Sequence, residues 1–139
     1  MTDTAYQGPL PVPDPETKPF WDGMREGRLM LQRCRSTGRH QFPPTTFCPD
    51  GLETPEWVEA SGRGTLFSWI VVRHPVPRDT YADKVPYVVA LVDLAEGCRM
   101  AGNIVDCDID AVAAGMPVEI AFNRVTAEIT LPAFRPAEG

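Results

Sequence analysis

Short strand-like runs fill the second half of the chain, and their order limits the fold more than any other feature. Three strand-like runs come first, then a helix-like run, and then two more strand-like runs. The helix-like run has Asp108 or Asp110 as its cap and Gly115 as its end. The order of these runs is that of an OB-fold, a five-stranded Greek-key barrel. Another small barrel or a sandwich is the alternative. The strand-like runs are residues 64–74, 86–94, 99–107, 117–125 and 128–134, and the helix-like run is 108–116.

The first half contains an amphipathic helix and then a change of pattern. Phe20, Trp21 and Met24 recur at the spacing of one helical turn, which predicts a helix from about Lys18 to Glu26. Thr17 is its expected N-cap, Pro19 suits its first turn, and Gly27 is its expected end. The predicted fold is therefore mainly β with an N-terminal helix. Its expected parts are an extended arm (1–16), a helix and ribbon (17–56) and an OB-fold domain (57–139).

The segment from Cys34 to Gly51 has the spacing of a zinc ribbon but only half of its cysteines. Such a ribbon uses two C-x2-C knuckles, and here Thr37 and Gly51 stand at the second and fourth ligand positions. Two thiolates alone hold zinc poorly, and His40 or Asp50 would need a different turn geometry to complete a site. We therefore expect a degenerate, metal-free ribbon in which Cys34 and Cys48 are small buried residues. A disulfide between them is geometrically reasonable, but a reducing compartment disfavours it.

Charge and hydropathy exclude several classes of function. The chain has 13 basic and 19 acidic residues, a net charge of -6 and a pI near 4.8, which argues against nucleic-acid binding. No apolar run reaches the length of a membrane span, and the N-terminus lacks the features of a signal peptide. We therefore expect a cytoplasmic protein without a membrane partner. In that compartment its four cysteines, Cys34, Cys48, Cys98 and Cys107, are expected to be reduced thiols.

Six fragments, in this order, resemble the family called domain of unknown function 35. They run from about Pro15 to Pro136 and read "KPFWDGMREGRLMLQRC", "FPPTTFCP", "EWVEASGRGTLFSWIVV", "PYVVALVDLAEGCRMAGNIV", "GMPVEIAF" and "LPAFRP". The resemblance implies an N-terminal helix, a rubredoxin-like ribbon and a C-terminal OB-fold. It also implies an accessory subunit that assembles with thiolase-like proteins, acyltransferases, enoyl-CoA hydratases or aldolases of steroid breakdown. Thr37 and Gly51 depart from the family's zinc-binding pattern.

Five residues are candidates for the contacts of such a subunit. Arg63, Trp69 and Arg73 combine guanidinium groups and an aromatic ring, which suit the phosphates and adenine of an acyl-CoA. The alternatives are a glycine-flanked turn at Arg63 and a core position for Trp69. Phe20 and Trp21 are candidates for a partner interface, and the alternative is packing of the helix onto the barrel.

The sequence lacks a Ser-His-Asp set, a glycine-rich phosphate loop and a Rossmann fingerprint. We therefore expect no catalytic residues in this chain. The leading hypothesis is a non-catalytic subunit of a hetero-oligomer that binds a thiolase-like, aldolase or hydratase partner and helps to hold an acyl-CoA thioester in lipid or steroid metabolism. A free-standing acyl-CoA or lipid binding module is one alternative. An OB-fold binder of single-stranded nucleic acid is another, which the net charge disfavours.

Overall fold

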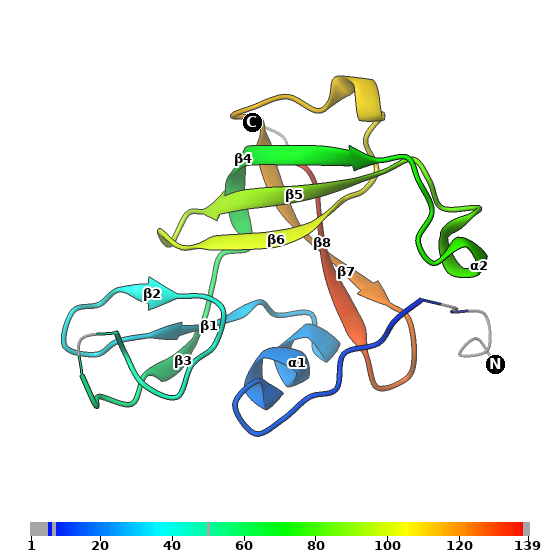
Figure 1. The fold of residues 1–139 in the computed structure, drawn as a ribbon. Helices are drawn as coiled ribbons and strands as arrows, with labels where there is room; N and C mark the ends of the chain where they lie inside the picture. The colour runs from blue at the N-terminus through cyan, green and yellow to red at the C-terminus, as the bar shows by residue number, and fades with distance from the viewer. Residues whose placement is uncertain (1–5, 7, 50, 138–139) are drawn as a thin grey trace.

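A helix, a small ribbon sheet and a barrel follow one another along the chain (Figure 1). The computed structural model describes residues 6, 8–49 and 51–137. Within these residues no helix is both long and apolar enough to cross a membrane. The elements are α1 Lys18–Arg25, β1 Met30–Arg33, β2 His40–Gln41, β3 Glu56–Glu59, β4 Arg63–Val72, α2 Arg78–Tyr81, β5 Tyr87–Leu94, β6 Arg99–Ile104, a 3-10 helix Ile109–Ala111, β7 Pro117–Arg124 and β8 Thr130–Pro136.

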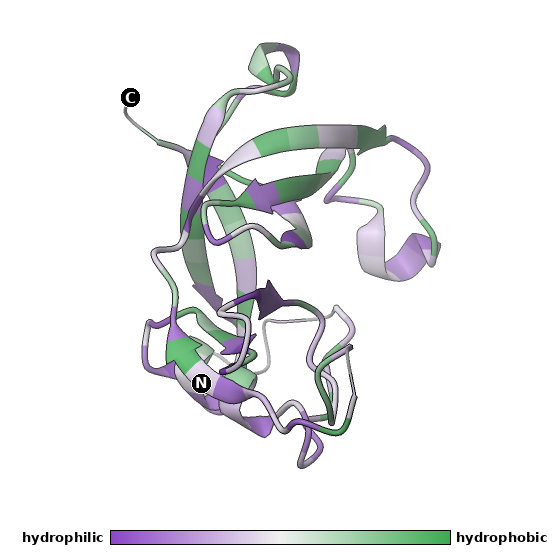
Figure 2. Cartoon of the chain, turned by 90° about the vertical axis from the view of Figure 1, so that its left-hand side faces the viewer, coloured by the Kyte–Doolittle hydropathy of each residue, from purple (hydrophilic) through white to green (hydrophobic). Residues whose placement is uncertain are grey.

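The last five strands form a closed barrel in the order β4-β5-β6-β8-β7. Strand β8 runs parallel to β6 and antiparallel to β7, and β7 pairs with the start of β4 to close the barrel. Along β5, Val88, Ala90, Val92 and Leu94 are buried while the residues between them are partly or fully exposed. This alternation buries one face of β5. Figure 2 shows bands of hydrophobic and hydrophilic residues along the barrel strands. The predicted OB-fold is confirmed.

Helix α1 forms where the sequence predicts it, but its start differs. Thr17 occupies the N-cap position without a side-chain cap. A turn from Asp14 precedes the helix instead: the Asp14 carboxylate accepts a hydrogen bond from the Thr17 amide at 2.8 Å, and the Asp14 carbonyl accepts one from the Lys18 amide at 2.8 Å. At the other end Gly27 has a φ of 78°, a conformation that glycine adopts without strain.

The buried face of α1 joins the ribbon sheet to the barrel. Phe20 and Met24 are 4% and 0% exposed and share one core cluster with Leu31 of β1 and Phe134 of β8. The helix also contacts β7. The three-stranded sheet β2-β1-β3 therefore packs through α1 against the barrel and has no separate core. The expected division of the chain after residues 16 and 56 stays a prediction.

Two segments between barrel strands differ from the sequence expectation. The helix predicted for 108–116 is only a 3-10 helix, capped by the Asp108 side chain, which accepts from the Asp110 amide. It ends early because the following backbone bonds to β4: the Gly115 amide donates to the Leu66 carbonyl, and the Leu66 amide donates to the Met116 carbonyl. The loop 75–86 contains the short helix α2, which the sequence analysis did not predict.

Replacement of Leu31, which is 1% exposed, should destabilise the shared core strongly. Leu31→Ala removes buried methyl groups and leaves a cavity, so we expect the free energy of unfolding to fall by about 2–5 kcal/mol. Leu52, which is 83% exposed, is the matched control. Leu52→Ala should change the free energy of unfolding by less than about 0.5 kcal/mol. Denaturant unfolding measures both, and equal losses would contradict the shared core.

Candidate functional site

The main pocket lies at the end of the barrel where the β4–β5 connection meets the β7–β8 turn. Its volume is about 850 Å³, within the usual range for small-molecule sites. In Figure 1, α2, the segment that leads into α1 and the β7–β8 turn all lie toward the right of the barrel. We call it the loop pocket. Its lining residues are Tyr6, Tyr81, Lys84, Tyr87, Asn103, Ile104, Val105, Asn123, Arg124, Val125, Thr126, Ala127 and Leu131.

Aromatic rings and a lysine gather on one side of the loop pocket. The rings of Tyr81 and Tyr87 stack with their centroids 5.6 Å apart and their planes 25° apart. The Lys84 ammonium lies 5.1 Å from the centroid of the Tyr6 ring and 5.4 Å from that of Tyr81. Burial raises the pKa of Tyr6, and the nearby Tyr81 raises it further, so the Tyr6 hydroxyl stays protonated at neutral pH.

The lining of the loop pocket also includes apolar residues and a second cation. Ile104, Val125 and Leu131 contribute aliphatic surface, and Arg124 lies at the end of β7. The Asn103 amide group donates a hydrogen bond to the Val88 carbonyl at 3.0 Å, which holds that side chain against β5. The pocket therefore combines apolar surface, stacked rings and two positive charges.

The three residues predicted to contact acyl-CoA lie along β4 and do not line the loop pocket. Arg63, at the start of β4, is exposed and has a nitrogen 3.4 Å from a Glu119 carboxylate oxygen. Trp69 is partly buried against the core. Arg73 is exposed just beyond the other end of β4. The two arginines are thus at opposite ends of one strand, and the contacts of all three with acyl-CoA stay a prediction.

Phe20 and Trp21, predicted as a partner interface, both pack within the chain. Phe20 is buried, and its ring meets that of Trp21 edge-on at 4.9 Å and that of Phe42 at 5.6 Å. Trp21 is partly buried against the core. The geometry favours the packing alternative for Phe20, whereas a partner contact of Trp21 stays a prediction.

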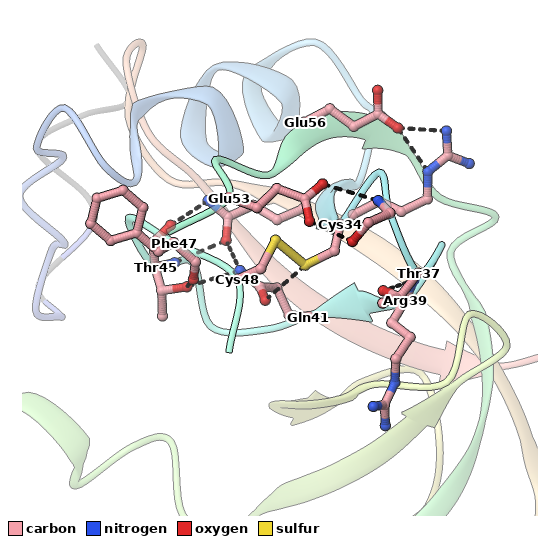
Figure 3. The surroundings of a disulfide bond; sticks show 12 residues. Cys34, Thr37, Arg39, Gln41, Thr45, Phe47, Cys48, Glu53 and Glu56 are labelled. Carbon is pink, nitrogen blue, oxygen red and sulfur yellow. Dashed lines mark hydrogen bonds and ion pairs between the residues drawn. A yellow bond between two sulfur atoms is a disulfide. The ribbon is translucent and has the colours of Figure 1, made fainter. Parts of the chain in front are cut away.

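The ribbon holds Cys34 and Cys48 together in a disulfide (Figure 3). Each cysteine begins a tight turn: the Cys34 amide donates to the Arg39 carbonyl, and the Cys48 amide donates to the Glu53 carbonyl. These turns place the two Cα atoms 6.0 Å apart, a distance that a disulfide spans. The expectation that all four cysteines are reduced is therefore wrong for this pair. Both side chains are buried, as predicted.

Polar side chains connect the two turns around the disulfide. The Glu53 carboxylate accepts hydrogen bonds from the Ser36 hydroxyl at 2.6 Å and the Ser36 amide at 3.0 Å, and these bonds lower the pKa of Glu53. Buried Gln32 donates to the Thr45 carbonyl and accepts from the Thr45 and Gln41 nitrogens. The ribbon is thus held by hydrogen bonds as well as by the disulfide.

The ribbon residues do not fit a tetrahedral zinc ion. Both cysteine sulfurs are used by the disulfide, and the Thr37 hydroxyl accepts a hydrogen bond from the Arg39 amide at 3.2 Å. Residues 6, 8–49 and 51–137 contain no group of three or more histidine, cysteine or acidic residues able to hold a metal ion. Asp50, one of the two residues considered as a replacement ligand, lies outside the described residues. His40 is left without the three further ligands that a structural zinc site needs.

The other two cysteines, Cys98 and Cys107, are free and partly buried. Burial raises the pKa of Cys98, and the charge of Glu96 raises it further. A raised pKa disfavours the thiolate, which is the reactive form of cysteine. The surroundings of Cys98 therefore do not suit a nucleophile.

A ribbon followed by a closed five-stranded barrel defines a class of small two-part proteins, and comparison with known proteins gives the family. Residues 21–50 match the rubredoxin-like zinc ribbon domain of ChsH2, and residues 57–123 match its C-terminal OB-fold domain. A DUF35 domain-containing scaffold protein of Methanocaldococcus jannaschii is 38% identical over 76% of this chain and 75% of its own length. The chain belongs to the DUF35 family.

Two further relatives are parts of enzymes by their descriptions. A probable enoyl-CoA hydratase alpha subunit of Thermomonospora curvata is 41% identical over 85% of this chain, which spans only 37% of that subunit's length. In the solved structure described as the Ltp2-ChsH2(DUF35) aldolase, one chain superimposes with a TM-score of 0.81 and is 36% identical. That match covers 93% of this chain and 100% of the other.

Loss of the disulfide should weaken the fold. The bond joins cysteines separated by 14 positions, and closing a loop of this length stabilises a protein by about 3 kcal/mol in the chain-entropy description. We expect a reductant to lower the free energy of unfolding of the parent by about that amount. The same reductant should leave the Cys34→Ser/Cys48→Ser variant unchanged. Denaturant unfolding with thiol counting is the measurement, and an unchanged parent with four free thiols would contradict this role.

Proposed function

We propose that this protein is a non-catalytic accessory subunit that binds a thiolase-like, aldolase or hydratase partner and helps to hold an acyl-CoA thioester. The observation that carries the proposal is the match to the DUF35 chain of the aldolase structure, which is covered over its full length at 36% identity. A chain that matches one chain of such an assembly over its full length is suited to the same position in a hetero-oligomer. Lipid or steroid metabolism is the corresponding setting.

The geometry of the chain supports a binding role more than a catalytic one. The loop pocket presents rings, aliphatic surface and two cations, and its described lining residues include no cysteine, histidine or carboxylate to act as nucleophile or base. The pKa of Cys98 is shifted in the direction that disfavours a thiolate. These features support a protein that holds a ligand while its partner carries out the chemistry.

A tagged form of the chain, recovered from its native host, should bring with it a stoichiometric thiolase-like, aldolase or hydratase subunit. Quantitative mass spectrometry and the mass of the purified complex test this expectation. Reconstitution should also raise the melting temperature of the partner, because binding to the folded state stabilises it. Recovery of the chain alone, with no effect on any such enzyme, would contradict the proposal. Saturable CoA-ester binding by that isolated chain would then favour a free-standing binding module.

We also propose that the ribbon binds no zinc, although its family is described by a zinc ribbon. The disulfide and the hydrogen bonds hold the two turns of this ribbon together, whereas four metal bonds hold the turns of a complete zinc ribbon. We also propose a cytoplasmic location for the protein. Trapping of thiols in freshly lysed cells would show whether Cys34 and Cys48 form their disulfide in the cell.

Restoring the two missing cysteines should create a zinc site. In the reduced Thr37→Cys/Gly51→Cys variant, four thiolates stand at the positions of two knuckles, so we expect one tetrahedral zinc per chain. The parent, reduced and treated in the same way, should contain none. Elemental analysis and absorption of the cobalt-substituted protein measure the difference. Stoichiometric zinc in the parent would contradict the metal-free ribbon.

A further inference from the structure

We propose that the loop pocket binds the nucleotide end of a coenzyme A thioester, with the adenine ring against the tyrosine rings and the phosphates beside Lys84 and Arg124. The identity of this ligand rests on the proposed function, whereas its position rests on the pocket. The residues differ from Arg63, Trp69 and Arg73, which lie along β4.

The charges in the loop pocket favour an anionic ligand. Lys84 and Arg124 both line it, and among the described lining residues there is no aspartate or glutamate. No carboxylate in the described part of the chain forms an ion pair with either cation. This arrangement stands out in a chain with a net charge of -6. Phosphate groups are the ligands that lysine and arginine side chains at such a site recognise.

The aromatic rings favour a planar group joined to those phosphates. Tyr81 and Tyr87 already form a stack, and a flat base can extend it. Stacking of a base on an aromatic side chain contributes to binding for every base, because each has a π-face. The Lys84 ammonium lies 5.4 Å from the centroid of the Tyr81 ring, so a phosphate bound by Lys84 would lie close to that ring. The ligand therefore combines an aromatic ring with phosphate.

Tyr6, which precedes α1 in the chain, forms part of the loop pocket. The Tyr6 ring lies 5.1 Å from the Lys84 ammonium, and its hydroxyl donates a hydrogen bond to the Pro9 carbonyl at 3.0 Å. With the ring of Tyr81 on its other side, Lys84 is held over the pocket by two aromatic faces. A phosphate would meet a lysine whose charge is already oriented.

Two other occupants fit the loop pocket less well. An acyl chain would gain contacts with Ile104, Val125 and Leu131 but would leave both cations without a partner. A single-stranded nucleic acid needs a basic track along its backbone, whereas this pocket supplies two cations in an acidic protein. A single nucleotide end satisfies both the rings and the charges.

The test is calorimetric titration of the full chain with coenzyme A, ADP and pantetheine. ADP retains the base and phosphates, whereas pantetheine lacks both. We expect saturable binding of coenzyme A and ADP and none of pantetheine. Lys84→Met and Arg124→Met should each weaken coenzyme A about tenfold, the usual cost of losing one charged hydrogen bond. Tyr81→Ala should have a similar effect, while Tyr81→Phe, which keeps the ring, should bind as the parent does.

Control variants separate this inference from the proposed function. Lys18→Met removes a lysine from α1 that pairs with Asp22, outside the loop pocket, and should leave binding unchanged. Every pocket variant should still assemble with the partner subunit. Coenzyme A binding that is insensitive to Lys84 and Arg124, or pantetheine binding as tight as that of coenzyme A, would overturn the inference. So would tighter binding of a single-stranded oligonucleotide than of ADP. Normal assembly with a partner but no binding of ADP or coenzyme A would overturn the inference and leave the proposed function standing.

Discussion

Burial of one face of α1 is the contact on which both halves of the molecule depend. Phe20 and Met24 enter a single cluster with Leu31 of the ribbon sheet and Phe134 of the barrel. The ribbon sheet has three short strands, too few residues to bury a core of their own. Because α1 supplies the missing apolar surface, the ribbon can keep its shape with a disulfide and a few hydrogen bonds. The departure of Thr37 and Gly51 from a zinc pattern thus leaves the fold intact.

Closure of the barrel decides where a ligand can bind. Since each barrel strand pairs with two neighbours, the connections between strands are the parts of the backbone most open to a ligand. The β4–β5 connection supplies Tyr81 and Lys84, and the end of β7 supplies Arg124. These residues are separated by some forty positions in the sequence and meet only because β4, β5 and β7 belong to one barrel. Arg63 and Arg73, in contrast, are kept apart by the length of β4, which begins at Arg63 and ends at Val72.

Most of the barrel could be predicted because its strands are short runs rich in valine, isoleucine and aromatic residues. The exceptions have physical causes. The 3-10 helix is shorter than its sequence pattern because Gly115 and Met116 bond to Leu66 of a distant strand. Strand β2 has two residues, too few to show any period. Of the site, no sequence signal linked Tyr6 and Arg124 to the loop 75–86, which supplies Tyr81 and Lys84.

The sequence alone determined the family, the order of the strands, the position of α1 and the replacement of two zinc-ligand positions, because these depend on residues close together in the chain. Only the tertiary structure decided that Cys34 and Cys48 form a disulfide and that Phe20 faces the core. It also decided that Lys84 and Arg124 share one pocket with three tyrosines. Each of these results depends on the distance between residues far apart in the sequence, and that distance is set by the packing of the ribbon, the helix and the barrel.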